Sequence, residues 1–155
     1  MNESLLNKAN IHQTAERYEK KYKGVKINYT PKTYEELQEL INQRIEKEGP
    51  EANLNDIDVS SITFMDNLFY GSEFNGDISQ WDVSNVESAR SMFLFAEKFN
   101  GNIEDWEWDS IKDMSFMFAN AGSFKQDLSK WNIKRSVPKV NMFQMCPAPK
   151  PTWYK

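Results

Sequence analysis

The 155-residue chain has very little histidine and cysteine, with one of each: His12 and Cys146. A single cysteine cannot form an internal disulfide, which fits a reducing compartment. No apolar run approaches the roughly 20 residues that a membrane-spanning helix needs. The first residues also lack the basic start and apolar stretch of a secretory signal. These absences together lead us to expect a cytoplasmic protein.

The sequence is also poor in the groups that enzymes use. His12 lies in a segment expected to be helical and Cys146 in a proline-rich tail, so neither has a neighbour that would make a nucleophile and base pair. The six glycines are isolated from one another, which excludes a glycine-rich phosphate loop. No acidic run has the glycine and final glutamate of a calcium loop. We therefore expect no catalytic residue, no metal site and no cofactor.

What the sequence does contain is an internal repeat. The block Phe74-Asn75-Gly76-Asp77-Ile78 returns 25 residues later at Phe99 and again at Phe124. Each of these phenylalanines is followed seven residues later by a tryptophan and eighteen residues later by a Met-Phe pair. A degenerate copy lies 24 residues before the first block. The chain therefore has four repeats.

The apolar positions of the repeat predict its fold. The string Ile78-x-x-Trp81-x-Val83-x-x-Val86 has the spacing of a leucine-rich repeat. The alternation around Trp81 and Val83 predicts a short strand with both side chains inward, and stacked repeats would bury a continuous core. We therefore expect an α/β fold, a short leucine-rich-repeat solenoid of about four 24–25-residue repeats with an N-terminal helical cap.

The length predicts a single domain over residues 1–155. Residues 1–50 do not share the period, so we interpret them as an N-terminal α-helical cap. Residues 51–145 hold the leucine-rich repeats. Residues 146–155 form a C-terminal tail that either seals or leaves the last repeat, because its prolines cannot continue a ladder.

Two helices and a strand are expected within the cap. Apolar residues at three- and four-residue steps before residue 23 predict the first helix, and the alternation of Val25, Ile27 and Tyr29 predicts a strand. The string Thr33-Tyr34-Glu35-Glu36 has the form of a capping box. It predicts a second helix, which should end at Gly49.

Acidic residues are concentrated in the middle of the chain. Residues 51–123 carry 14 acidic and 3 basic residues, whereas residues 124–155 carry 1 acidic and 7 basic residues. If Trp81 and Val83 face inward, the side chains between them should share one outer face in successive repeats. The carboxylates expected on this face are Asp56, Asp58, Asp82, Asp105, Glu107 and Asp109. Two alternatives remain, a solvated face that keeps the protein soluble and a turn-capping role for Asp58 and Asp82.

The repeats also resemble a known family. The block from Phe74 to Val86 and the string Asp113-Met114-Ser115-Phe116-Met117-Phe118 resemble the BspA-like leucine-rich-repeat surface protein family, with its Mycoplasma lipoprotein-type 25-residue repeat. Residues 31–50 resemble the helix that often precedes those repeats. The resemblance implies a right-handed solenoid of short parallel strands, a protein-binding role and no family-wide catalytic site.

These observations predict a non-enzymatic protein-binding module. An acidic face repels nucleic acid and suits a basic protein groove, such as that of a nuclease. Our leading interpretation is an intracellular inhibitor, of the immunity-protein or phage anti-defence (anti-CRISPR) type, that is monomeric alone and contacts neither nucleic acid nor membrane. The alternative is a bacterial surface adhesion or host-interaction protein. A third interpretation is a hydrolase that uses Asp105, Glu107 and Asp109.

Overall fold

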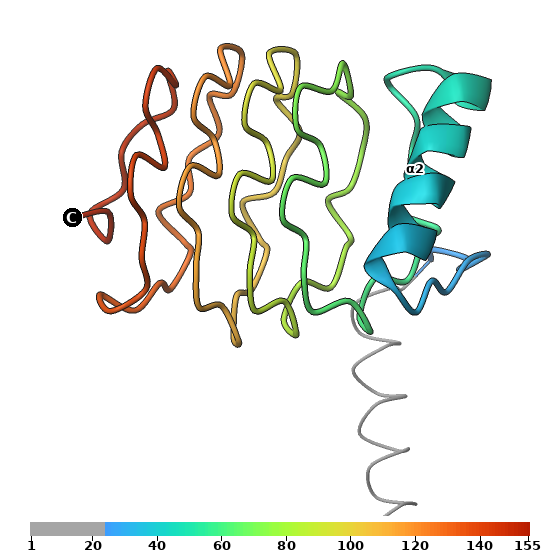
Figure 1. The fold of residues 1–155 in the computed structure, drawn as a ribbon, viewed down its shortest axis with the longest axis horizontal. Coiled ribbons are helices and arrows are strands. Elements are labelled where there is room, and N and C mark those ends of the chain that lie inside the picture. Colours follow the sequence, from blue (N-terminus) through green and yellow to red (C-terminus); the bar gives the residue numbers. More distant parts are fainter. Residues whose placement is uncertain (1–23) are drawn as a thin grey trace, which may run out of the picture.

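The computed structural model describes residues 24–155, in which the one α-helix is α2 (Tyr34–Glu48). Parallel pairing within these residues is limited to isolated bridges, and no regular strand forms. Figure 1 shows α2 at one end of a row of backbone loops that lie side by side, with the C-terminus at the other end. The predicted first helix and His12 lie outside the described residues.

The prediction of an α/β leucine-rich-repeat solenoid is wrong. One helix and a few isolated bridges in residues 24–155 do not make a parallel sheet. In the tryptophan segments the backbone donors are used locally, since Trp81 N donates to Ile78 O at 3.1 Å and Val86 N to Val83 O at 3.0 Å. These turns use amide groups that a strand would offer its neighbour, so the segment bends.

The strand predicted near the start of the described residues is also wrong. Of Val25, Ile27 and Tyr29, only Tyr29 pairs with another segment, in a single parallel bridge to Ile57. The capping box is confirmed, because Glu36 N donates to Thr33 Oγ1 at 3.1 Å at the first turn of α2. Gly49 ends the helix with φ of 91° and donates its N–H to Ile45 O at 2.8 Å.

The four repeats lie against one another through equivalent backbone hydrogen bonds. We number them 1 to 4, over residues 51–73, 74–98, 99–123 and 124–145. Each Met-Phe segment donates to the next repeat along the chain. The bonds, each 2.9 Å long, run from Phe69 N to Met92 O, from Phe93 N to Met117 O and from Phe118 N to Met142 O. The repeat is therefore a real structural unit, although its backbone is irregular.

Stacked aromatic rings run through the core from repeat to repeat. Phe93 stacks on Phe118 with 5.4 Å between ring centroids, and Trp81 stacks on Trp106 at 6.4 Å and 3°. Trp81 and Val83 are fully buried, which confirms their predicted inward orientation. Rings of this size bury more apolar area than any other side chains, so the ladder dominates the energetics of the core.

The C-terminal tail seals the last repeat. Trp153 stacks on Trp131 with centroids 6.1 Å apart, and its Nε1 donates to Leu128 O at 2.9 Å. Trp153 thus takes the place that the tryptophan of a fifth repeat would fill. Of the two outcomes left open for residues 146–155, the structure has the sealing one.

Candidate functional site

Repeat 3 departs from the other repeats at its tryptophan segment. Where repeat 2 has Asp82-Val83-Ser84, repeat 3 has Glu107-Trp108-Asp109. The Trp108 side chain is buried, and its ring stands at 74° to Trp106 and at 67° to Trp131, with centroids 5.6 and 5.3 Å away. A large ring in a valine position therefore lies crosswise between two rungs of the tryptophan ladder.

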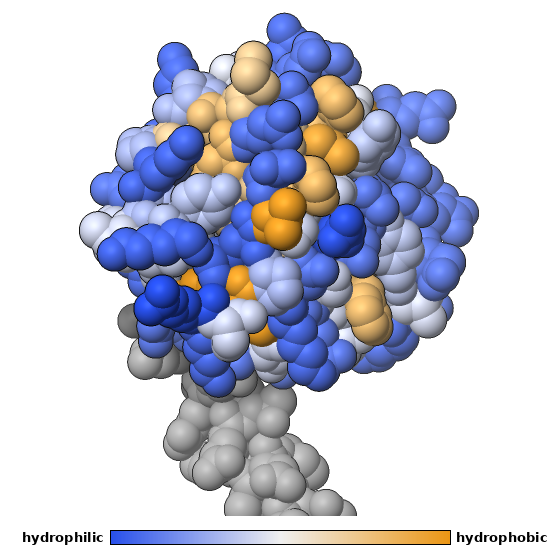
Figure 2. Space-filling model, turned by 60° about the vertical axis from the view of Figure 1, so that its left-hand side comes forward, coloured by the Kyte–Doolittle hydropathy of each residue, from blue (hydrophilic) through white to orange (hydrophobic). Residues whose placement is uncertain are grey.

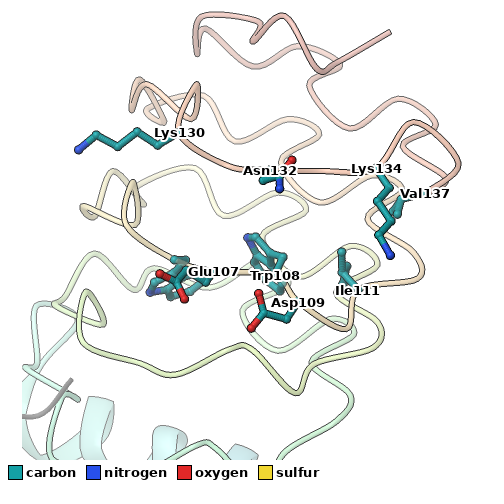
Figure 3. Close-up of a pocket in the computed structure, with 9 residues that line it drawn as sticks. Glu107, Trp108, Asp109, Ile111, Lys130, Asn132, Lys134 and Val137 are labelled. Carbon is teal, nitrogen blue, oxygen red and sulfur yellow. The ribbon is translucent and has the colours of Figure 1, made fainter. Parts of the chain in front are cut away.

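A groove of about 460 Å³ opens beside this crosswise ring, between repeats 3 and 4 (Figure 3). Its volume lies within the range of roughly 300–1,000 Å³ that is usual for ligand sites. Repeats 3 and 4 each contribute to the lining. The lining residues are Trp106, Glu107, Trp108, Asp109, Ile111, Lys130, Asn132, Lys134 and Val137.

The two sides of the groove carry opposite charges. Repeat 3 contributes the exposed carboxylates of Glu107 and Asp109, and repeat 4 contributes the exposed side chains of Lys130, Asn132 and Lys134. In Figure 3 the Lys130 side chain extends to one side, while Lys134 points from repeat 4 toward the side of Ile111. The groove therefore offers hydrogen-bond acceptors on one side and cationic donors on the other.

The Trp108 side chain, which lines the groove, also carries a buried polar atom. Its Nε1 is buried and has no hydrogen-bond partner within residues 24–155. Figure 3 places this nitrogen on the Asn132 side of the ring. Because buried donors are nearly always paired, this N–H is an exception that requires an explanation.

Comparison with known proteins assigns the chain to a family. Residues 35–153 match the family described as "Mycoplasma protein of unknown function, DUF285". The chain belongs to the DUF285 family. DUF285 is related to the BspA-like surface repeat proteins that the sequence resembles, without establishing a leucine-rich-repeat family, and it supports a bacterial origin. The chain matches no curated protein and no solved structure.

Two of the six predicted carboxylates of this DUF285 protein cap turns. Asp82 is buried rather than outward, and its Oδ1 accepts from Ser84 N at 3.1 Å and Ser84 Oγ at 2.5 Å. Asp58 is half-buried and accepts from Ser60 N at 2.9 Å. The turn-capping alternative therefore holds for Asp58 and Asp82, because a short carboxylate readily bonds the amide two residues on.

Two further carboxylates are held in ion pairs. Asp56 is half-buried and pairs with Arg44 of α2 at 2.8 Å. Arg44 also pairs with Glu48, and the hydrogen bond that the guanidinium donates to the Glu48 carboxylate is the main cause that raises the pKa of Arg44 above its ordinary value. Asp105 is exposed and lies 3.2 Å from Lys130. The six carboxylates consequently do not form one continuous strip.

Glu107 and Asp109 are the predicted carboxylates that the DUF285 fold leaves exposed at the groove. Sequence reasoning placed them correctly on the outside but missed Trp108, which shapes the groove and supplies its buried donor. A signal for Trp108 was present, because only repeat 3 has a second tryptophan two residues after the first.

Residues 24–155 of the DUF285 chain contain one cysteine, Cys146, and one helix, α2. This part has no cluster of three or more histidine, cysteine, aspartate or glutamate side chains suited to a metal ion. Burial raises the pKa of the Cys146 thiol, which makes it less reactive. No helix in the described part has the length and apolar character to cross a membrane.

The described surface also carries exposed apolar side chains. Tyr70 packs edge-on against Phe95 with centroids 6.0 Å apart, and both are about half exposed. Figure 2, turned toward the C-terminal end, shows a mostly hydrophilic face with apolar surface gathered in its upper part. Further exposed apolar side chains are Tyr29, Phe64, Val140 and Met145. Such residues can support an interface around a charged groove.

Proposed function

We propose that this DUF285 chain is a non-enzymatic protein-binding module that docks a positively charged segment of a partner in the groove between repeats 3 and 4. The observation that carries the proposal is the exposure of Glu107 and Asp109 at a groove that is open to a ligand. Carboxylates in such a position attract a basic partner and fix its register.

The two groove carboxylates differ from their counterparts in repeat 2. There Asp82 and Ser84 are buried and bonded to each other, which stabilises a turn. Glu107 and Asp109 in the same positions are exposed, and the glutamate is one methylene longer. The exposed acids of repeat 3 thus place negative charge where a partner can reach it.

We favour an intracellular form of this function. A small acidic module that occupies the basic groove of a partner such as a nuclease would act as an inhibitor, of the immunity or phage anti-defence type. The predicted cytoplasmic location belongs to this proposal. The partner would be steered by charge, so its association should slow as salt is added.

A second candidate is a bacterial surface adhesion or host-interaction protein. The relation of DUF285 to BspA-like surface repeat proteins favours it. Cell fractionation of the native host separates the two candidates. Recovery in the cytosol supports the inhibitor, and recovery on the cell envelope supports the adhesin.

The binding site itself can be tested with a double variant, Glu107→Gln with Asp109→Asn. The wild type, this variant and a charge-matched control, Glu73→Gln with Glu97→Gln at exposed repeat corners, would be used to capture partners from host extract at low salt. We expect the wild type and the control to retain a basic protein, identified by mass spectrometry, and the groove variant to lose it. Equal retention by all three would contradict the proposed site.

A further inference from the structure

The buried indole N–H of Trp108, a residue that lines the groove, is a donor without an acceptor among the described residues. The side chain is 6% exposed, and Nε1 meets no acceptor among the described residues. Trp108 is the one described residue with such a buried, unpartnered side-chain atom. A donor in this position is costly to the folded protein unless something supplied from outside accepts its hydrogen bond.

The other tryptophans of the core show what kind of acceptor fits. Each of their indole N–H groups donates to a main-chain carbonyl of the preceding repeat. The bonds run from Trp81 to Leu54 O, Trp106 to Ile78 O, Trp131 to Ile103 O and Trp153 to Leu128 O, at 2.9 to 3.1 Å. Trp108 is the additional tryptophan of repeat 3, and its position provides no such carbonyl.

The surroundings of Trp108 narrow the class of ligand. Glu107 and Asp109 flank it in the chain and are exposed, which favours a cationic side chain on the repeat 3 side. Lys130 and Lys134 on the repeat 4 side disfavour a second cation. Asn132 lies on the side of the ring nitrogen and can both donate to and accept from a peptide backbone.

We propose that the groove binds an extended peptide segment whose main-chain carbonyl accepts the Trp108 N–H while a neighbouring lysine or arginine side chain lies against Glu107 and Asp109. This inference rests on the proposed protein-binding function and specifies its ligand. In this arrangement Trp108 recognises the peptide backbone through one hydrogen bond. The carboxylates of Glu107 and Asp109 select a basic side chain.

The test follows the indole N–H signals of the full chain, labelled with ¹⁵N, by NMR. The Trp108 signal is identified as the one that disappears in Trp108→Phe. The probes are two blocked tripeptides, acetyl-Ala-Arg-Ala-amide and acetyl-Ala-Glu-Ala-amide. We expect the arginine peptide to shift the Trp108 signal downfield in a saturable manner and the glutamate peptide to leave it in place.

A double variant and a charge-matched control test whether the two groove carboxylates bind the peptide. In the double variant Glu107→Gln with Asp109→Asn, the affinity for the arginine peptide should fall by roughly fivefold to tenfold, since each exposed ion pair contributes modestly to binding. The control Glu73→Gln with Glu97→Gln should bind like the wild type. A Trp108 signal that does not move, or that moves equally with both peptides, would overturn the inference.

A competing explanation is that the Asn132 side chain turns and accepts the N–H in the free protein. In that case Asn132→Ala should move the Trp108 signal upfield without any peptide, and that result would also overturn the inference. Failure of the peptide-binding inference can be distinguished from failure of the proposed protein-binding function. A captured partner that binds Trp108→Phe as tightly as wild type, but not the groove double variant, rejects the peptide-reading role alone.

Discussion

At the residue scale, local hydrogen bonds decide where the acidic side chains point. An aspartate two residues before a serine bonds the serine amide and bends the chain, as Asp58 and Asp82 do. The same arrangement recurs at Asp77 and Asp127, which bond the amides of Ser79 and Ser129. An outward face deduced from alternation alone therefore fails where a side chain can cap its own turn.

The unpaired donor of Trp108 can be tested through stability. Trp108→Phe and Trp106→Phe remove the same group of atoms from the same core, but only Trp106 loses a hydrogen bond, to Ile78 O at 3.1 Å. We expect Trp106→Phe to lower the free energy of unfolding by about 1–3 kcal/mol more than Trp108→Phe does. Urea denaturation of both variants measures this difference. Equal losses would mean that the Trp108 N–H is paired.

Backbone strain at Phe95 gives a second prediction. Equivalent positions of the repeats all have left-handed backbone, with Gly71 at φ of 62°, Phe95 at 58° and Asn120 at 56°. Glycine and asparagine adopt this conformation at lower cost than phenylalanine does. We expect Phe95→Asn to raise the free energy of unfolding by about 0.5–1 kcal/mol, because relief of strain exceeds the loss of a half-exposed contact with Tyr70. Asn120→Ala, as the reverse case, should lower it, and a lower melting temperature for Phe95→Asn would refute this account.

Acid sensitivity is expected at Asp77. Partial burial raises the pKa of its carboxyl, but hydrogen bonds from Ser79 and Asn55 outweigh burial and hold the pKa below its ordinary value of 3.8. The stability that this carboxylate adds is therefore complete above pH 3.8 and is lost as the pH falls through the folded-state pKa. Asp77→Asn should show a smaller loss of stability between pH 5 and pH 2 than wild type in urea titrations. An unchanged pH profile would contradict this role.

At the scale of elements, the ends of the repeat row are closed in different ways. Helix α2 covers repeat 1 with the buried side chains of Leu37 and Ile41, and Tyr34 Oη donates to Asp66 O at 2.7 Å. Trp153 covers repeat 4. Repeat arrays need such caps because a terminal repeat otherwise leaves one side of its core exposed.

The C-terminal cap can be removed with one substitution. Trp153→Ala removes the ring stacked on Trp131 and the hydrogen bond to Leu128 O. Since Trp153 is half-buried, we expect a loss of about 2–3 kcal/mol in the free energy of unfolding. Hydrogen exchange should speed up in repeat 4 and less in repeat 1. Trp153→Phe, which keeps a stacked ring, should lose less, and equal exchange rates along the chain would argue against a capping role.

At the scale of the whole molecule, the sequence allowed part of the architecture to be predicted. The repeat period, the inward Trp81 and Val83 and the Thr33 capping box depend on local spacing and were predicted correctly. The prediction of a parallel sheet was wrong, because turns within each tryptophan segment use the backbone donors that strands need. Exposed Glu107 and Asp109 were predicted, whereas the groove was not, since it depends on how one oversized ring packs between repeats.

The central claim is that the groove between repeats 3 and 4 receives a basic segment of a partner. The most direct test is titration calorimetry of the identified partner against wild type, the Glu107→Gln and Asp109→Asn double variant, and the Glu73→Gln and Glu97→Gln control, at two salt concentrations. We predict that the groove variant binds about tenfold or more weakly at low salt and has a reduced salt dependence, while the control matches wild type. Binding by the groove variant that equals wild type at low salt would contradict the claim.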